Sequence, residues 1–136
     1  MDCVFCAIRD GKIPALKLHD DERVMAFMDI NPRTEGHCLV VPKAHAETVF
    51  DLEEADAAAL MPVVVRVAKA VKAAFNPDGM NLVQANGKAA AQLVPHFHMH
   101  ILPRWYTDGV VIDWHHQPGN LEHIKANWEK IRALLG

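Results

Sequence analysis

The stretch that decides the fold is His96-Phe97-His98-Met99-His100-Ile101-Leu102, in which imidazoles alternate with apolar side chains. Successive side chains of a β-strand point to opposite faces of the sheet. The alternation therefore predicts a strand over residues 95–102, ended by Pro103, with the three histidines on one face and the apolar residues on the core side. Because histidine is a modest strand former and clustered imidazoles oppose one another's protonation, this face is expected to serve a chemical purpose.

Three interpretations of the histidine face are open on the residues alone. In the first, the imidazoles only hydrogen-bond locally on a polar face of the sheet. In the second, alternate histidines of one strand share a metal ion. In the third, the middle imidazole, His98, acts as a nucleophile that its neighbours orient, which a neutral ring nitrogen can do near neutral pH.

Hydrophobic runs before this stretch predict the rest of the sheet. Residues 24–30 are apolar and β-prone and stop at Asn31-Pro32, a turn signal, and residues 37–41 form an apolar run that ends at Pro42. We expect these two runs to be antiparallel neighbours, with a further short strand over residues 80–84. The order strand, strand, helix, strand, strand predicts an α+β domain with a mainly antiparallel sheet.

One long helix is expected between the two pairs of strands. Asp51 can cap it and Glu54 follows three residues later, as in a capping box, and apolar residues then recur at spacings of three and four as far as Phe75. Pro62 is expected to kink or break this helix near Leu60, because proline has no N–H and its ring clashes with the preceding turn.

The composition and charge of the chain bound its class. With 136 residues, of which 51% are hydrophobic and 23% charged, the chain fits one soluble globular domain with a single core. Its formal net charge of −3 argues against a nucleic-acid partner, although a phosphate site needs only a few donors. We expect no signal peptide, no membrane span and a cytoplasmic location, since the N-terminus has no basic region and the apolar runs are short.

Several further motifs occur in a fixed order before the histidine stretch. They are Cys3-Val4-Phe5-Cys6, Ile13-Pro14, Ala26-Phe27-Met28-Asp29-Ile30-Asn31-Pro32, Gly36-His37, and Val40-Val41-Pro42-Lys43 with His45. Together with the triad and the Pro103-Arg104 that follows it, they resemble the histidine triad (HIT) superfamily. The resemblance covers residues 3 to about 104 and does not include the tail from Trp105 onward.

The resemblance implies an activity for the histidines. In this family the middle histidine, here His98, attacks the α-phosphate of a nucleotide derivative, and water cleaves the nucleotidyl-imidazole intermediate. His96 and His100 would fix its tautomer or donate to phosphate oxygens, and this chemistry requires no metal. The expected reaction is hydrolysis of AMP-X compounds of the nucleoside phosphoramidate type. The alternatives are a dinucleoside polyphosphate hydrolase, a nucleotidyl transferase, or a purine-nucleotide binding protein with little turnover.

The resemblance also implies a nucleotide pocket. Phe5, Ile8 and Phe27 match positions that enclose the purine, Asp29 matches the residue that accepts hydrogen bonds from the ribose hydroxyls, and Gln92 matches a phosphate-loop position. Ile30, and Asn86 next to the position where the family has an asparagine, complete the expected nucleotide-binding residues. Taken singly, the aromatic and aliphatic residues would be read as core, and Asp29 as a turn cap. The loop departs from the family pattern at Ala85, Ala91 and Leu93, where an amide, a glycine and a hydroxyl are usual, and this weakens the expectation of strong catalysis.

Two cysteines near the N-terminus raise the question of a metal. A lone Cys-x-x-Cys pair is compatible with redox chemistry, small buried residues or half of a zinc site. Members of the family that bind a structural zinc use such a pair with two histidines, which implies Cys3, Cys6, His45 and His96 as ligands here. Two thiolates and two imidazoles close a tetrahedral shell and leave no open position for catalysis. Without zinc, His45 would instead assist the triad.

Residues 4–9 are expected to form a short N-terminal helix that stops at Gly11. The resemblance implies a mainly antiparallel five-stranded sheet with one long helix, joined into one continuous sheet across a homodimer. We divide the chain into a HIT-like nucleotide-binding domain, residues 1–104, and a C-terminal extension, residues 105–136. The extension is expected to contain an amphipathic helix over residues 121–135 that packs on the same domain or on the partner. Trp114 is assigned to core or dimer packing and His115-His116 to a loop.

Overall fold

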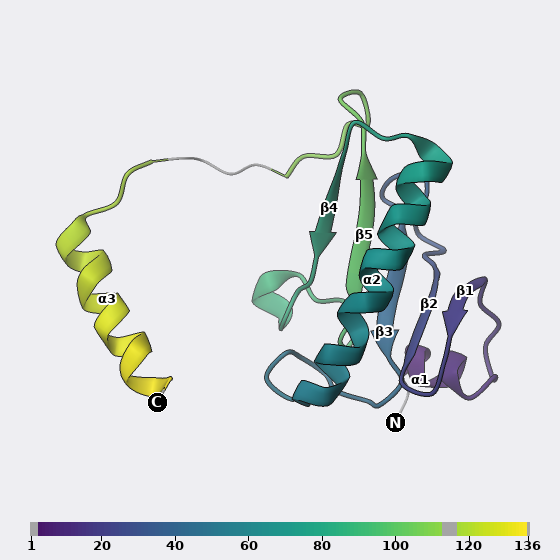
Figure 1. Ribbon diagram of the computed structural model, residues 1–136, viewed down its shortest axis with the longest axis horizontal. Coiled ribbons are helices and arrows are strands. Elements are labelled where there is room, and N and C mark those ends of the chain that lie inside the picture. Colours follow the sequence, from purple (N-terminus) through teal and green to yellow (C-terminus); the bar gives the residue numbers. More distant parts are fainter. Residues whose placement is uncertain (1–2, 113–116, 136) are drawn as a thin grey trace.

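The computed structural model describes residues 3–112 and 117–135, so Trp114 and His115-His116 lie outside the described residues. Figure 1 shows a single sheet with one long helix across it. In chain order the elements are α1 (Val4–Arg9), β1 (Lys17–Asp20), β2 (Val24–Met28), β3 (Cys38–Pro42), α2 (Glu54–Phe75), β4 (Gly79–Val83), a 3-10 turn η1 (Lys88–Ala90), β5 (Met99–Arg104) and α3 (Leu121–Leu134).

The five strands form one antiparallel sheet in the order β1-β2-β3-β5-β4. This confirms the α+β class, the five-stranded antiparallel sheet and the expected pairing of residues 24–30 with residues 37–41. Strand β1 is not predicted by the sequence pattern, because its four residues are mostly exposed and lack an apolar alternation. It is an edge strand that β2 pairs with and orders.

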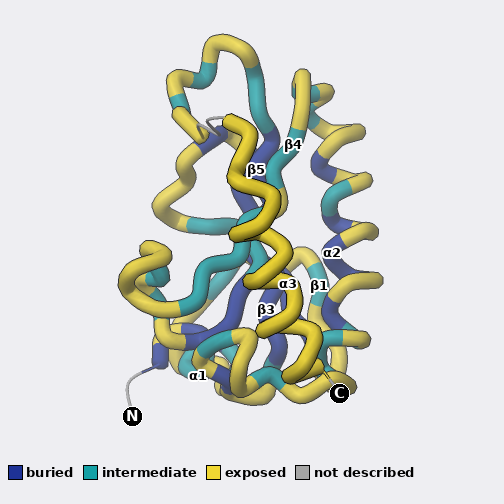
Figure 2. The backbone as a smooth tube through the Cα atoms, turned by 90° about the vertical axis from the view of Figure 1, so that its left-hand side faces the viewer, coloured by how far each residue is buried: buried dark blue, intermediate teal, exposed yellow. Residues whose placement is uncertain are grey.

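Residues are buried on both faces of the sheet, and Figure 2 marks the buried stretches of the backbone in dark blue. On one face, α2 packs Leu60, Val64 and Val71 against a cluster that includes Val40 and Ile101. On the other face, the short helix α1 packs against a second cluster, whose buried members are Cys3, Phe5, Ile8, Met25, Phe27, Leu39 and Val41. The expected orientation of the triad stretch is confirmed: Phe97 and Ile101 lie on the α2 face, whereas His100, which pairs with Leu39, lies on the α1 face.

The strand expected over residues 95–102 is wrong in its limits, because β5 begins at Met99 and ends at Arg104. Before Met99 the chain leaves the ladder: the N–H of Phe97 donates to the carbonyl of Ala46, at 2.7 Å, instead of to a neighbouring strand. Pro103 does not end the strand. Pairing with β3 stops at Ile101, so only β4 lies beside Pro103, and the missing N–H costs no bond to β3.

The expected start and break of the long helix are also wrong. Helix α2 begins at Glu54 with Glu53 as its N-cap, and no side chain caps it. The carboxylate of Asp51 is already engaged by the N–H and hydroxyl of Thr48, at 3.2 and 3.1 Å. Pro62 lies inside one continuous helix. Both Pro62 and Ala58 are exposed, so water can satisfy the Ala58 carbonyl that Pro62 leaves without a donor.

The C-terminal helix is present as expected, but none of the described residues 117–135 is buried. In Figure 1, α3 stands apart from the sheet, beyond the edge strand β4. Among the described residues, no helix is both long and apolar enough to cross a membrane.

Gly36, the residue before His37, lets the β2–β3 loop pack closely against Phe75 at the end of α2. Its φ is +83°, and a Cβ there would lie 2.7 Å from Cε2 of Phe75. Gly11 has a similar φ of +75° but open space around it, so a Cβ there would meet nothing within 4 Å.

We therefore expect Gly36→Ala to lower the free energy of unfolding by about 2–3 kcal/mol, because the methyl group adds a clash with Phe75 to the cost of a left-handed backbone. Gly11→Ala should lower it by only about 1 kcal/mol, the backbone cost alone. Urea denaturation of both variants checks this. Equal losses would contradict the role of the Phe75 contact.

Candidate active site and metal centre

Hydrogen bonds to carbonyl groups fix the tautomers of His96 and His98. Nε2 of His96 lies 2.7 Å from the carbonyl of Pro42, and Nδ1 of His98 lies 2.6 Å from the carbonyl of His96. A carbonyl oxygen only accepts, so the proton of each ring must be on the nitrogen that faces it. The other nitrogens, Nδ1 of His96 and Nε2 of His98, are left with free lone pairs.

The ring of His98 is buried beside α1 and kept uncharged. Its relative exposure is 6%, and the ring of Phe5 meets it edge to face at a centroid distance of 5.1 Å. Burial lowers the pKa of His98 below its usual value, against smaller raising effects of its hydrogen bond to His96 and of the charge of Asp29. A neutral imidazole with a free Nε2 is the form in which histidine is a nucleophile.

A chain of hydrogen bonds places the proton of His100 on Nε2, the opposite nitrogen to that of His98. Nδ1 of His37 accepts from the N–H of Arg33 at 3.1 Å, so the proton of His37 is on Nε2. That nitrogen donates to Nδ1 of His100 at 2.9 Å and lies 3.4 Å from a carboxylate oxygen of Asp29. His100 therefore carries its proton on Nε2 and offers an N–H donor, with its ring centroid 4.7 Å from that of His98.

The place of His37 beside the triad is not predicted by the sequence pattern. This histidine is 2% exposed, and burial is the main cause that lowers its pKa. Burial also lowers the pKa of His100 to about 4. The signal that could have found it is the pairing of β3 with β5, which brings the start of β3 next to His100 but cannot be read from the residues alone.

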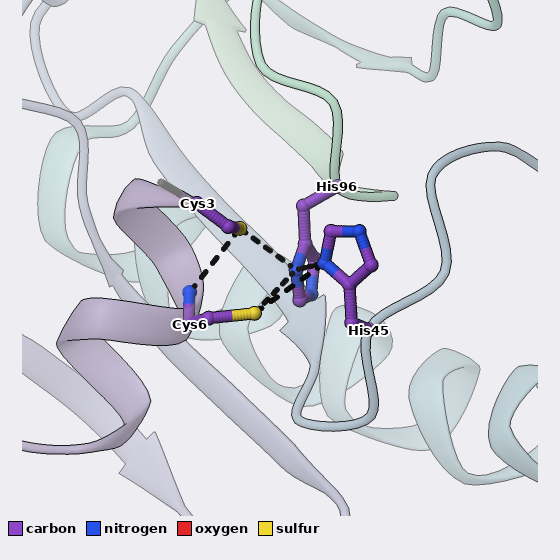
Figure 3. A group of neighbouring side chains, drawn as sticks. All are labelled: Cys3, Cys6, His45 and His96. Carbon is purple, nitrogen blue, oxygen red and sulfur yellow. Dashed lines mark hydrogen bonds between the residues drawn. The ribbon is translucent and has the colours of Figure 1, made fainter. Parts of the chain in front are cut away.

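Four side chains expected to bind zinc converge at one end of the triad (Figure 3). Cys3 and Cys6 come from the start of α1, His45 from the loop after β3, and His96 from the segment before β5. Their ligand atoms all lie within 4.8 Å of one another. The contact distances are 3.4 Å from Sγ of Cys3 to Nδ1 of His96, 3.4 Å from Sγ of Cys6 to Nδ1 of His45, and 3.1 Å between the Nδ1 atoms of His45 and His96.

This geometry fits a tetrahedral metal ion. Zinc lies about 2.3 Å from sulfur and about 2.0 Å from nitrogen, so the edges of a tetrahedral ligand shell are roughly 3.3 Å between two nitrogens, 3.5 Å between nitrogen and sulfur, and 3.8 Å between two sulfurs. The observed distances are close to these edges. The donor set also fits, because the hydrogen bond to Pro42 leaves Nδ1 of His96 unprotonated and turned toward the thiols. The four residues are therefore a possible Cys/His metal site.

The residues expected to enclose a purine are mostly buried. Phe5, Ile8 and Phe27 are 3–6% exposed and belong to the cluster under α1, whereas Ile30 is 86% exposed. Asp29 combines two roles: Oδ1 accepts from the N–H of Asn31 at 2.7 Å, as a turn cap would, and Oδ2 faces His37. Its side chain thus lies at the triad end of the β2–β3 loop.

The amides of the loop before the triad hold the loop itself. Oδ1 of Asn86 accepts from the N–H of Val49 at 2.7 Å. Oε1 of Gln92 accepts from the N–H of Gly87 at 2.7 Å, and Nε2 of Gln92 donates to the carbonyl of Glu47 at 2.6 Å. Ala91, where the family pattern has glycine, adopts a left-handed φ of 66°. Leu93, in place of the usual hydroxyl residue, is 91% exposed.

Comparison with known proteins identifies the family of this chain. A family model described as the HIT domain matches residues 10–106. Protein hit of Bacillus subtilis is 38% identical, and the alignment covers 97% of this chain and 95% of that protein. Adenosine 5'-monophosphoramidase hnt1 of Schizosaccharomyces pombe is 39% identical, with 99% of each chain covered.

Solved structures show the same fold. The protein SMU.412c from Streptococcus mutans superposes with a TM-score of 0.94 at 34% identity, covering 99% of this chain and 86% of its own. A zinc-bound histidine triad family protein from Mycobacterium smegmatis gives a TM-score of 0.74 at 34% identity, with 98% of each chain covered. With residues 10–106 matched by the family model and relatives at 38–39% identity over nearly their whole length, this chain belongs to the HIT family.

Proposed function

We propose that this protein hydrolyses AMP-X compounds of the nucleoside phosphoramidate type through a nucleotidyl-His98 intermediate. The observation that carries the proposal is the hydrogen bond from Nδ1 of His98 to the carbonyl of His96, which leaves Nε2 unprotonated next to the N–H of His100. A relative named as an adenosine 5'-monophosphoramidase supports the choice of substrate class.

In the first step, the lone pair of Nε2 of His98 forms a bond to the α-phosphorus while the bond from phosphorus to the leaving amine breaks. The amine departs with the electron pair and takes up a proton from water, while Nε2–H of His100 donates a hydrogen bond to a phosphate oxygen. In the second step, water attacks the phosphorus and releases its proton to the solvent, the His98–phosphorus bond breaks with its electron pair returning to Nε2, and AMP is released. The His37–Asp29 pair holds His100 in the donor tautomer during both steps.

The same geometry would serve a dinucleoside polyphosphate hydrolase or a nucleotidyl transferase, in which a phosphate leaves or another nucleophile replaces water. A nucleotide-binding protein with little turnover is favoured by one observation: the Asn86 and Gln92 side chains are engaged within the loop, and the usual hydroxyl is replaced by Leu93. We prefer the hydrolase because the tautomers of His98 and His100 are arranged for reaction.

We also propose that the Cys/His metal site holds a structural zinc, bound by Cys3, Cys6, His45 and His96. Zinc would supply no catalytic chemistry, since the four ligands close its shell. It would tie α1 to the segment before β5 and so hold the triad against Phe5. Three unpaired cysteines suit the reducing cytoplasm, where we place the protein.

The proposed homodimer joins two sheets through β4. This strand is at the edge of the sheet, and in the described part of the chain nothing pairs with its outer side. Leu82 in its middle is 47% exposed. Pairing β4 with its counterpart in a second copy would satisfy the exposed ladder and bury this apolar surface, as closed two-fold assemblies do.

We expect His98→Ala to reduce AMP release from a lysine AMP-phosphoramidate by a factor of about 10³ or more, because no nucleophile remains. Its affinity for AMP should change by no more than a few-fold. Release of AMP followed by chromatography, with AMP binding by calorimetry, checks both. His123→Ala on the exposed face of α3 is the control and should behave as wild type.

Two outcomes would count against the hydrolase. If the wild-type protein binds AMP and turns over no AMP-X substrate, it is a nucleotide-binding protein instead. If His98→Ala keeps its turnover, His98 is not the nucleophile.

We expect purified protein to contain about one zinc per chain, and Cys6→Ser to lose it. Cys38→Ser is the matched control: Cys38 is buried in the other cluster, on the α2 face, so its zinc content should equal that of wild type. Elemental analysis of the three proteins measures this. Metal that is lost only in His98→Ala would show that the triad, and not the Cys/His site, binds the ion.

A further inference from the structure

Helix α3 carries an apolar stripe that the described part of its own chain leaves uncovered. The stripe consists of Leu121, Ile124, Trp128, Ile131 and Leu135, spaced by three and four residues so that all five lie on one face. Trp128, in the middle, is 51% exposed, and none of the described residues 117–135 is buried. Such a contiguous apolar surface is typical of an interaction site.

The body of the protein has an apolar groove on the α2 face of the sheet. Its volume is about 470 Å³, and it lies between α2 and strands β1, β2 and β3. The main lining residues are Leu18, Met28, Val67, Ala70, Ala74 and Phe75, with His19 and Arg66 as the polar residues. The triad is on the opposite face of the sheet, so the groove is not part of the proposed active site.

The groove and the helix are at opposite ends of the sheet. The groove is next to β1 and β2, whereas α3 stands beyond β4 at the other edge (Figure 1). The view from that side shows α3 in front of the sheet (Figure 2). In this arrangement, α3 does not cover the groove of its own chain.

The position of α3 recurs in a solved structure. Its 14 residues are about a tenth of the 136-residue chain, and a helix that failed to superpose would lower the TM-score by about that share. The superposition on SMU.412c reaches 0.94 over 99% of this chain, so α3 must superpose with the rest. A protruding arm that is placed alike in two proteins at 34% identity is a defined structure and requires a surface to hold it.

We propose that α3 is an exchanged arm, whose apolar stripe docks in the groove between α2 and β1–β2 of a second copy of the chain. The proposal rests on the homodimer through β4 proposed above. A copy paired along the outer side of β4 would occupy the side of the sheet on which α3 stands. Two-fold symmetry then makes the exchange reciprocal, so that both stripes and both grooves are covered in one closed assembly.

The test alters the stripe and the groove separately in the full-length protein. Trp128→Asp places a charge in the stripe, and Ala70→Trp fills the groove from the exposed side of α2. Ala126→Asp is the matched control, because it adds the same charge on the opposite face of α3. Sedimentation equilibrium over a range of concentrations gives the dissociation constant of the dimer, and far-UV circular dichroism verifies that each variant is folded.

Trp128→Asp and Ala70→Trp are each expected to raise the dissociation constant at least 10-fold, and Ala126→Asp to leave it within 2-fold. The double variant Trp128→Asp/Ala70→Trp should be no weaker than the worse single variant, because both remove one contact. Unchanged association of Trp128→Asp would overturn the arm. Weakening by Trp128→Asp but not by Ala70→Trp would overturn the groove as its docking site.

The release of AMP from the phosphoramidate is measured on the same samples. A wild-type protein that is monomeric at all concentrations overturns both the arm and the homodimer. If that monomer still releases AMP, the proposed hydrolysis stands. If a dimer with the expected dependence on Trp128 and Ala70 releases none, the arm stands and the hydrolysis is wrong.

Discussion

The hydrogen bond from the His98 ring to the His96 carbonyl is the contact on which the site depends. His96 makes three different connections at once. Its Nε2 is anchored to Pro42 at the end of β3, its Nδ1 faces the thiols of α1, and its carbonyl fixes the tautomer of His98. His96 therefore links the possible metal site, which its side chain faces, to the proposed nucleophile His98, which its carbonyl orients. A displacement of His96 would disturb both.

Burial on the α1 face keeps the histidines neutral, as the proposed chemistry requires. Desolvation is the largest influence on His96, His98 and His100 and lowers the pKa of each. In water, imidazoles this close would protonate in part and repel one another. The fold avoids this by covering the rings with the short helix α1. A helix of about one and a half turns is not stable alone, so the contacts of its cysteines and of Phe5 are needed to hold it in place.

The sequence predicted those features that depend on local pattern: the α+β class, the antiparallel pair β2–β3, and helices α1 and α3. The grouping of Cys3 and Cys6 with His45 and His96 was predicted from the resemblance to the family. Features that depend on tertiary pairing were missed. Strand β1 forms only because β2 lies beside it, His37 meets His100 only through the pairing of β3 with β5, and β5 starts late because Phe97 bonds to Ala46. The prediction of Asp51 as the cap of α2 was wrong because its carboxylate accepts a hydrogen bond from the N–H of Thr48.

Ala91 shows where a departure from a family pattern acts. In the left-handed region a Cβ costs the folded chain roughly 1 kcal/mol or more relative to glycine, which exceeds what alanine regains by restricting the unfolded chain. The three hydrogen bonds of Gln92 hold the loop in shape against this strain. The alanine is therefore a stability cost confined to the backbone of the loop.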